Sequence, residues 1–145
     1  MLTGLKEIGG AMYYLDNSGA MQTGWKNLDD IWYYFESSGA AATSKWVKVS
    51  NKWYYFDSDS MMVTGKQTIN GNKYYLDNNG AMQTGWKNLD GIWYYFESSG
   101  AAATSKWVKI SNTWYYFDSD SKMVTGKQTI DGKEYSFDSD GAWVA

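Results

Sequence analysis

Tryptophan and tyrosine are the side chains with the most distinctive chemistry in this 145-residue chain. The sequence has nine Trp, thirteen Tyr and five Phe, and aromatic residues make up 19% of it. Most of its apolar surface therefore belongs to flat, polarisable rings, which attract cations over their faces. Cys, His, Pro and Arg are absent. Without Cys and His the chain has no thiolate nucleophile, no imidazole base and no usual zinc ligands, which argues against most catalytic chemistry.

The tryptophans that matter most occur in pairs seven residues apart. These pairs are Trp25/Trp32, Trp46/Trp53, Trp86/Trp93 and Trp107/Trp114, and the same two positions are Leu5/Met12, Lys66/Lys73 and Lys127/Glu134 elsewhere. Positions that accept two lysines cannot belong to the core, because burying two ammonium groups would cost several kcal/mol. We therefore expect these positions to face outward or to line a groove. Exposed pairs of Trp on a small domain indicate a ligand.

Internal repetition provides the elements that position these pairs. Residues 20–69 match residues 81–130 at a shift of 61, and four differences in 50 positions leave 46 identities. Shorter units of 20 or 21 residues lie within this period. We place seven of them at 3–22, 23–42, 43–63, 64–83, 84–103, 104–124 and 125–145. Such short periods predict an array in which each unit contacts mainly its neighbours.

Each unit has the sequence pattern of a β-hairpin. In the second unit, an extended stretch over 23–28 leads to the turn-forming Asp29-Asp30, then to the β-prone run 31–35 and a loop over 36–39. Asp90-Gly91, Asn70-Gly71 and Asp131-Gly132 are equivalent turn signals. A lone hairpin is marginal in water, so the units must stack. We predict an all-β solenoid, a superhelical stack of about seven hairpins forming a single module over 1–145.

The residues that recur in nearly every unit are expected to form the scaffold. Tyr-Tyr pairs persist whatever stands at the Trp positions, and an apolar residue follows them. We expect this last position to fill the interior; its residues are Phe35, Phe56, Phe96 and Phe117, with Leu15 and Leu76 as equivalents. Met1 leads directly into a repeat, which suggests a fragment of a larger protein.

These motifs resemble the choline-binding repeats of surface proteins from Gram-positive bacteria and their phages. The signature Gly-Trp, short turn, Trp-Tyr-Tyr is found at Gly24-Trp25 with Trp32-Tyr33-Tyr34 and at Gly85-Trp86 with Trp93-Tyr94-Tyr95. The Gly-x-Met element is Gly19-Ala20-Met21 and Gly80-Ala81-Met82. The resemblance covers essentially the whole chain. Unit 64–83 looks closer to the related glucan-binding and clostridial-toxin repeats.

The resemblance implies that choline binds between consecutive hairpins, in a cage of two Trp from one unit and a Tyr and a Met from the next. It implies a first cage of Trp25, Trp32, Tyr54 and Met62, and a second of Trp46, Trp53, Tyr74 and Met82. The third would be Trp86, Trp93, Tyr115 and Met123, and the fourth Trp107, Trp114 and Tyr135, with Trp143 in place of Met. Lys66 and Lys73 beside Tyr94 should repel choline, and Leu5 and Met12 beside Tyr33 should offer one ring at most.

The implied function is non-catalytic attachment to the bacterial cell wall, through choline or phosphocholine on teichoic and lipoteichoic acid. The protein would then be secreted and cell-surface bound, with no cofactor and no metal. The net charge of −3 and the pI of about 4.8 argue against nucleic acid. No apolar run reaches the roughly 18–20 residues that span a bilayer, so no membrane insertion is expected. The oligomeric state is left open.

The sequence also has features of three other classes of function. An enzyme would use acidic pairs such as Asp57/Asp59 and Asp118/Asp120, but turn formation explains these residues, and their duplication is unusual for an active site. A carbohydrate-binding array for glucan or cell-surface oligosaccharide also uses aromatic platforms; paired Trp favour choline over it. A structural spacer leaves the exposed Trp unexplained.

Overall fold

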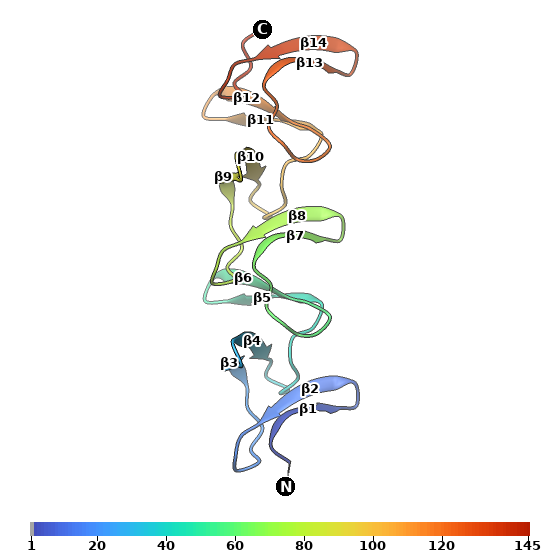
Figure 1. The fold of residues 1–145 in the computed structure, drawn as a ribbon, viewed down its shortest axis with the longest axis vertical. Helices are drawn as coiled ribbons and strands as arrows, with labels where there is room; N and C mark the ends of the chain where they lie inside the picture. The colour runs from blue at the N-terminus through green and yellow to red at the C-terminus, as the bar shows by residue number, and fades with distance from the viewer. Residues whose placement is uncertain (1) are drawn as a thin grey trace. The chain divides into compact units, whose positions relative to one another are not determined.

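The protein is built from seven antiparallel β-hairpins, each a separate two-stranded sheet (Figure 1). A computed structural model describes residues 2–145, and no helix occurs among them. The strands are β1 (Gly4–Ile8), β2 (Ala11–Leu15), β3 (Gly24–Leu28), β4 (Ile31–Phe35), β5 (Lys45–Val49), β6 (Lys52–Phe56), β7 (Gly65–Ile69), β8 (Asn72–Leu76), β9 (Gly85–Leu89), β10 (Ile92–Phe96), β11 (Lys106–Ile110), β12 (Thr113–Phe117), β13 (Gly126–Ile130) and β14 (Lys133–Phe137). The predicted all-β array of seven hairpins is confirmed.

Two-residue turns set the register of the hairpins. In β3–β4, Gly24 pairs with Phe35 and Leu28 with Ile31, which leaves Asp29 and Asp30 as the turn. Their φ angles are 54° and 66°, the left-handed pair of a type I′ turn, whose twist matches that of the strands. Asn70-Gly71, with φ of 52° and 83°, forms the same turn. The turn signals read from the sequence are therefore confirmed.

A carboxylate closes the loop that follows the second strand of a hairpin. Asp57 Oδ1 accepts hydrogen bonds from the N–H groups of Asp59 at 2.9 Å and Met61 at 3.0 Å. Met62 then forms an isolated antiparallel bridge with Phe56, and Met123 forms the same bridge with Phe117. This explains the recurrent aspartates as loop formers.

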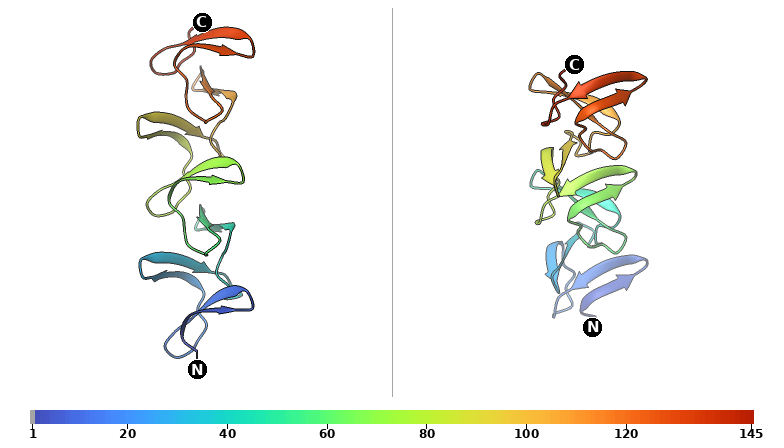
Figure 2. Two further views of the ribbon diagram at one scale, coloured as in Figure 1. Left: turned by 45° about the vertical axis from the view of Figure 1, so that its right-hand side comes forward. Right: turned by 45° about the horizontal axis from the view of Figure 1, so that its top comes forward.

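The chain divides into two compact units. The first consists of the residues up to Gly65 together with Leu76–Met82, and the second of Lys66–Tyr75 together with Gln83–Ala145. The single module over 1–145 stays a prediction. Within the second unit, β7–β8 and β13–β14 point to the same side, while β9–β10 between them points elsewhere (Figure 2). Within this unit the direction of a hairpin is thus repeated by the third hairpin after it, and the sequence repeats over the same interval of 61 residues.

The core of each compact unit lies where one hairpin and the loop after it pack against the preceding hairpin. The first compact unit has a buried cluster of Tyr33, Phe35 and Ala41. The equivalent cluster in the second compact unit is Tyr94, Phe96 and Ala102. The predicted interior positions Phe35, Phe56, Phe96, Phe117 and Leu76 are at most 1% exposed, as expected. Leu15 is the exception, because it is only half-buried.

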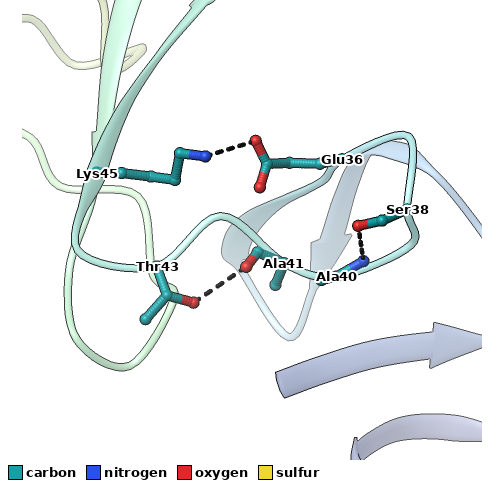
Figure 3. A network of polar contacts seen from close by, with 6 residues as sticks. All are labelled: Glu36, Ser38, Ala40, Ala41, Thr43 and Lys45. Carbon is teal, nitrogen blue, oxygen red and sulfur yellow. Dashed lines mark hydrogen bonds and ion pairs between the residues drawn. The ribbon is translucent and has the colours of Figure 1, made fainter. Parts of the chain in front are cut away.

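The third and sixth sequence repeats, 43–63 and 104–124, carry one extra residue and have a different loop. Ser60 and Ser121 stand where five other loops have Gly; their φ angles are 67° and 68°, and they are 1% exposed. Their hydroxyls contact those of Thr43 and Thr104, respectively. Thr43 also donates to the carbonyl of Ala41 at 3.0 Å, and an ion pair of 2.8 Å joins Lys45 to Glu36 across the same connection (Figure 3).

Candidate functional site

The first cage is a corner of nearly perpendicular rings. Trp25 on β3 lies 5.9 Å from Trp32 on β4 between ring centroids, at an interplanar angle of 88°. Tyr54 on β6 lies 4.9 Å from Trp25 at 76°. With Met62, these residues line a pocket of about 320 Å³. The structure thus brings together all four residues that the resemblance named.

The third cage repeats this geometry in the second compact unit. Trp86 lies 5.9 Å from Trp93 at 88° and 4.9 Å from Tyr115 at 75°. Met123 completes the lining of a pocket of about 310 Å³. Two copies of one sequence, 61 residues apart, therefore build the same corner.

The fourth cage has a ring in place of the thioether. Trp107 lies 6.4 Å from Trp114 at 85° and 4.9 Å from Tyr135 at 72°. Trp143 lies 6.2 Å from Trp107 and 6.5 Å from Tyr135. These four aromatic residues line a pocket of about 290 Å³. The substitution of Met by Trp143 retains a pocket and gives it a fourth aromatic wall.

The second cage stays a prediction from the sequence. Trp46, Trp53 and Met82 belong to the first unit, whereas Tyr74 belongs to the second. Within the first unit, the N–H of Met82 donates to the carbonyl of Trp53 at 2.8 Å. Trp46 packs against Tyr55 at 5.1 Å between ring centroids, as Trp25 does against Tyr34 at 5.2 Å.

A backbone hydrogen bond between hairpins places the fourth residue of each cage. The N–H of Met62 donates to the carbonyl of Trp32 at 3.0 Å, and Met123 donates to Trp93 at the same distance. Trp143 donates to Trp114 at 2.9 Å. Because this bond joins main-chain atoms, it holds the position at the cage whichever side chain it carries.

The loop of the following hairpin supports the methionine from behind. A Cβ atom added to Gly80 would collide with Sδ of Met62, and one added to Gly141 would collide with Sδ of Met123. These loop glycines therefore lie in close contact with the cage.

The two tryptophans of a pair have different surroundings. The second ones, Trp32, Trp53, Trp93 and Trp114, are 38–41% exposed, and we call them the outer tryptophans. The first ones, Trp25, Trp46, Trp86 and Trp107, are half-buried. Trp25, for example, also packs against Phe56 at 5.8 Å. The expectation that the pairs face outward or line a groove is confirmed, but the inner tryptophans also belong to the packing.

The two junctions expected to lack a cage carry different residues. Between the fourth and fifth hairpins, Lys66 Nζ donates to Tyr94 Oη at 2.9 Å and lies 4.9 Å from the centroid of the Tyr94 ring. Between the first and second, a pocket of about 390 Å³ is lined by Leu5, Tyr14 and Tyr33 but not by Met12, and it extends to Asp29 in the turn of β3–β4, so it is not the counterpart of the cages. The expected site at Leu5, Met12 and Tyr33, with one ring at most, stays a prediction. Burial raises the pKa of the Tyr33 hydroxyl, and the nearby carboxylate of Asp29 adds to this effect.

Four polar residues at the cages were missed by the sequence reasoning. Asn78 and Asn79 line the pocket of the first cage, and Ser139 and Asp140 line that of the third. They come from the loop that carries Gly80 or Gly141, one hairpin beyond the Tyr of the cage. The period of 61 relates Asn78 to Ser139 and Asn79 to Asp140, a signal in the sequence that marks them as equivalent.

Such a corner of ring faces suits a cation that has no hydrogen to donate. The face of each ring is electronegative, so a quaternary ammonium is attracted without needing an acceptor.

Among residues 2–145, no three acidic side chains converge on a point that would hold a metal ion. The same residues contain no helix that is long and apolar enough to cross a membrane.

Repeated hairpins with aromatic cages at their junctions define a repeat-type ligand-binding module. The choline-binding repeat family matches the chain in overlapping segments, at residues 2–46, 42–83, 63–107, 83–122 and 103–144. The chain therefore belongs to the choline-binding repeat family. A comparison with curated proteins finds no match.

Solved structures of pneumococcal proteins share the fold. CbpJ from Streptococcus pneumoniae is 38% identical with a TM-score of 0.87, over 99% of this chain and 52% of that one. Choline binding protein F from the same species is 40% identical with a TM-score of 0.84, over 99% and 52%. The autolysin LytC of S. pneumoniae, in complex with a synthetic peptidoglycan ligand, is 28% identical with a TM-score of 0.62, over 92% and 36%. This chain spans about half the length of the first two.

Proposed function

We propose that this chain is a non-catalytic module that attaches its protein to the bacterial cell wall by binding choline groups of teichoic and lipoteichoic acid. The observation that supports it most directly is the corner of Trp25, Trp32 and Tyr54, which recurs as Trp86, Trp93 and Tyr115. Membership of the choline-binding repeat family points to the same ligand. The protein would be secreted and held at the cell surface.

Each cage is expected to be weak by itself. Three ring faces at roughly 0.5–2 kcal/mol each give a few kcal/mol, which corresponds to about millimolar affinity. Teichoic acid carries many cholines, so that a chain with several cages gains avidity once one cage is occupied. We propose four binding cages, with the second, formed by Trp46, Trp53, Tyr74 and Met82, completing the set.

The proposal is tested by titrating choline and, separately, dextran while Trp fluorescence is followed, and by retention on a tertiary-amine resin. We expect saturation by choline in the millimolar range, and elution from the resin by free choline. A chain that ignores choline at tens of millimolar but is retained on dextran would be a carbohydrate-binding module instead.

A matched variant makes this test specific to the cages. Replacing the four outer tryptophans by Ala removes one wall from each cage while leaving the half-buried inner tryptophans in place. We expect this variant to keep its β-sheet circular dichroism and to lose retention on the resin. It should also no longer bind purified teichoic acid, whereas the unaltered chain should bind it only when the polymer carries choline.

A further inference from the structure

The first and third cages have the same walls but different rims. The 61-residue period gives the two cages identical residue types at their walls. Trp25, Trp32, Tyr54 and Met62 in the first correspond to Trp86, Trp93, Tyr115 and Met123 in the third. The remaining lining residues are Asn78 and Asn79 in the first cage, and Ser139 and Asp140 in the third. The first cage thus has two neutral amides at its rim, and the third has a carboxylate.

This difference lies in the side chains and not in the course of the loop. Asp77 Oδ1 accepts hydrogen bonds from the N–H groups of Asn79 at 2.9 Å and Ala81 at 3.0 Å. Asp138 Oδ1 accepts the equivalent bonds from Asp140 and Ala142 at the same two distances. Since Gly80 and Gly141 also lie against the cage methionines alike, the rim residues occupy equivalent places.

The chemistry of the two rims favours different forms of the ligand. An Asn amide donates hydrogen bonds to an oxyanion, so the first rim suits a phosphate next to a bound ammonium. A carboxylate accepts only, and it attracts a cation while repelling a phosphate. Ser139 offers one hydroxyl, which does not offset that charge.

We infer that Asn79 and Asp140 determine ligand preference, so that the first cage favours phosphodiester-linked choline and the third favours free choline or another unphosphorylated quaternary ammonium. This inference rests on the proposed function. One array would then hold the polymer through its first cage, while its third cage responds preferentially to small free cations. Asp140 is exposed, so the effect at the rim is modest.

Two single-cage proteins allow the test. W53A/W93A/W114A keeps only the first cage intact, and W32A/W53A/W114A keeps only the third; every substituted Trp is an exposed outer one. Choline and glycerophosphocholine are titrated into each while Trp fluorescence is followed. We expect the ratio of the glycerophosphocholine Kd to the choline Kd to be about threefold higher in the third cage, and the difference to shrink in about 1 M salt, which screens the carboxylate of Asp140.

Rim swaps assign the effect to the two residues. D140N in the third-cage protein should lower the ratio to that of the first cage, and N79D in the first-cage protein should raise it. D120N is the matched control, because Asp120 has the same loop position one hairpin earlier and does not line the third cage. It makes the same change in net charge and should leave the ratio unaltered.

Each failure has its own signature. Equal ratios in the two cages, or a D140N variant that behaves like D120N, would overturn the inference while choline still binds. Loss of response to both ligands in both folded single-cage proteins would instead remove the proposed function. If the triple variants do not fold, D140N and D120N are compared in the full chain by following the indole N–H signals of Trp86 and Trp93 by NMR; equal ratios there count against the inference.

Discussion

The ammonium of Lys66 lies against the ring of Tyr94, with Nζ 2.9 Å from Oη and 4.9 Å from the ring centroid. Tyr94 has the same place in its hairpin as the cage tyrosines Tyr54 and Tyr115. The junction therefore holds a cation of its own against the ring that a ligand would contact elsewhere. This contact gives a second reason, beyond charge repulsion, why no choline is expected there.

Replacing Lys66 and Lys73 together by Trp should create an additional choline site. The backbone is already suitable, because Ala102 donates its N–H to the carbonyl of Lys73 at 2.8 Å, as Met62 does to Trp32. Isothermal titration calorimetry should show one more millimolar site than in the unaltered chain. K66A is the control: it removes the internal ammonium without adding a ring. If the double variant binds no more choline than K66A, the junction lacks the geometry of a cage.

Removing Trp93 should weaken one site and little else. Trp93 is 41% exposed, so W93A loses one wall of the third cage, an effect of about tenfold on its affinity, at small cost in stability. The NMR shifts of Trp25 and Trp32 on adding choline should be unchanged. Loss of binding in the first unit as well would argue against separate cages.

The inner tryptophan of the same cage should behave differently. Trp86 packs against Tyr95 at 5.3 Å and Phe117 at 5.7 Å in addition to the cage rings. W86A should therefore lower the free energy of unfolding by about 2–4 kcal/mol as well as abolishing the third cage. Urea denaturation of W86A and W93A side by side measures this contrast; equal stability would place Trp86 outside the packing.

The contact between the hydroxyls of Thr43 and Ser60 in the third sequence repeat should contribute to stability. Ser60 is buried, and the side chain of Thr43 provides its hydroxyl contact. T43V keeps the shape but leaves the Ser60 hydroxyl without this partner, which should cost about 1–3 kcal/mol in thermal or urea unfolding. Thr23 begins the second sequence repeat as Thr43 begins the third, and the corresponding loop residue there is Gly39, which has no hydroxyl. T23V should therefore change stability by less than about 0.5 kcal/mol.

The sequence predicted the hairpins and the outward-facing Trp pairs because both depend on local patterns. Turn pairs such as Asn70-Gly71 specify their conformation directly, and the exchange of Trp for Lys at one pair of positions indicates that those positions are not fully buried. The family resemblance then supplied which Tyr and Met face each pair. Contacts made between hairpins were less accessible. Asp140 reaches a cage from the second hairpin beyond its Trp pair, and only stacking brings it there.

The glycine behind the third cage should be required for the position of Met123. Gly141 has a φ of +85°, and a Cβ there would collide with Sδ of Met123. Gly132, in the turn of β13–β14, has a φ of +81° and open space around it. G141A and G132A should each lose about 1 kcal/mol of stability from the left-handed backbone. Only G141A should also displace Met123 and weaken choline binding at the third cage, by about threefold or more, because the thioether wall must move. Comparing the choline-induced NMR shifts of Trp86 and Trp93 in the two variants separates the effects: equal weakening would mean that backbone strain, and not contact with Met123, governs the cage.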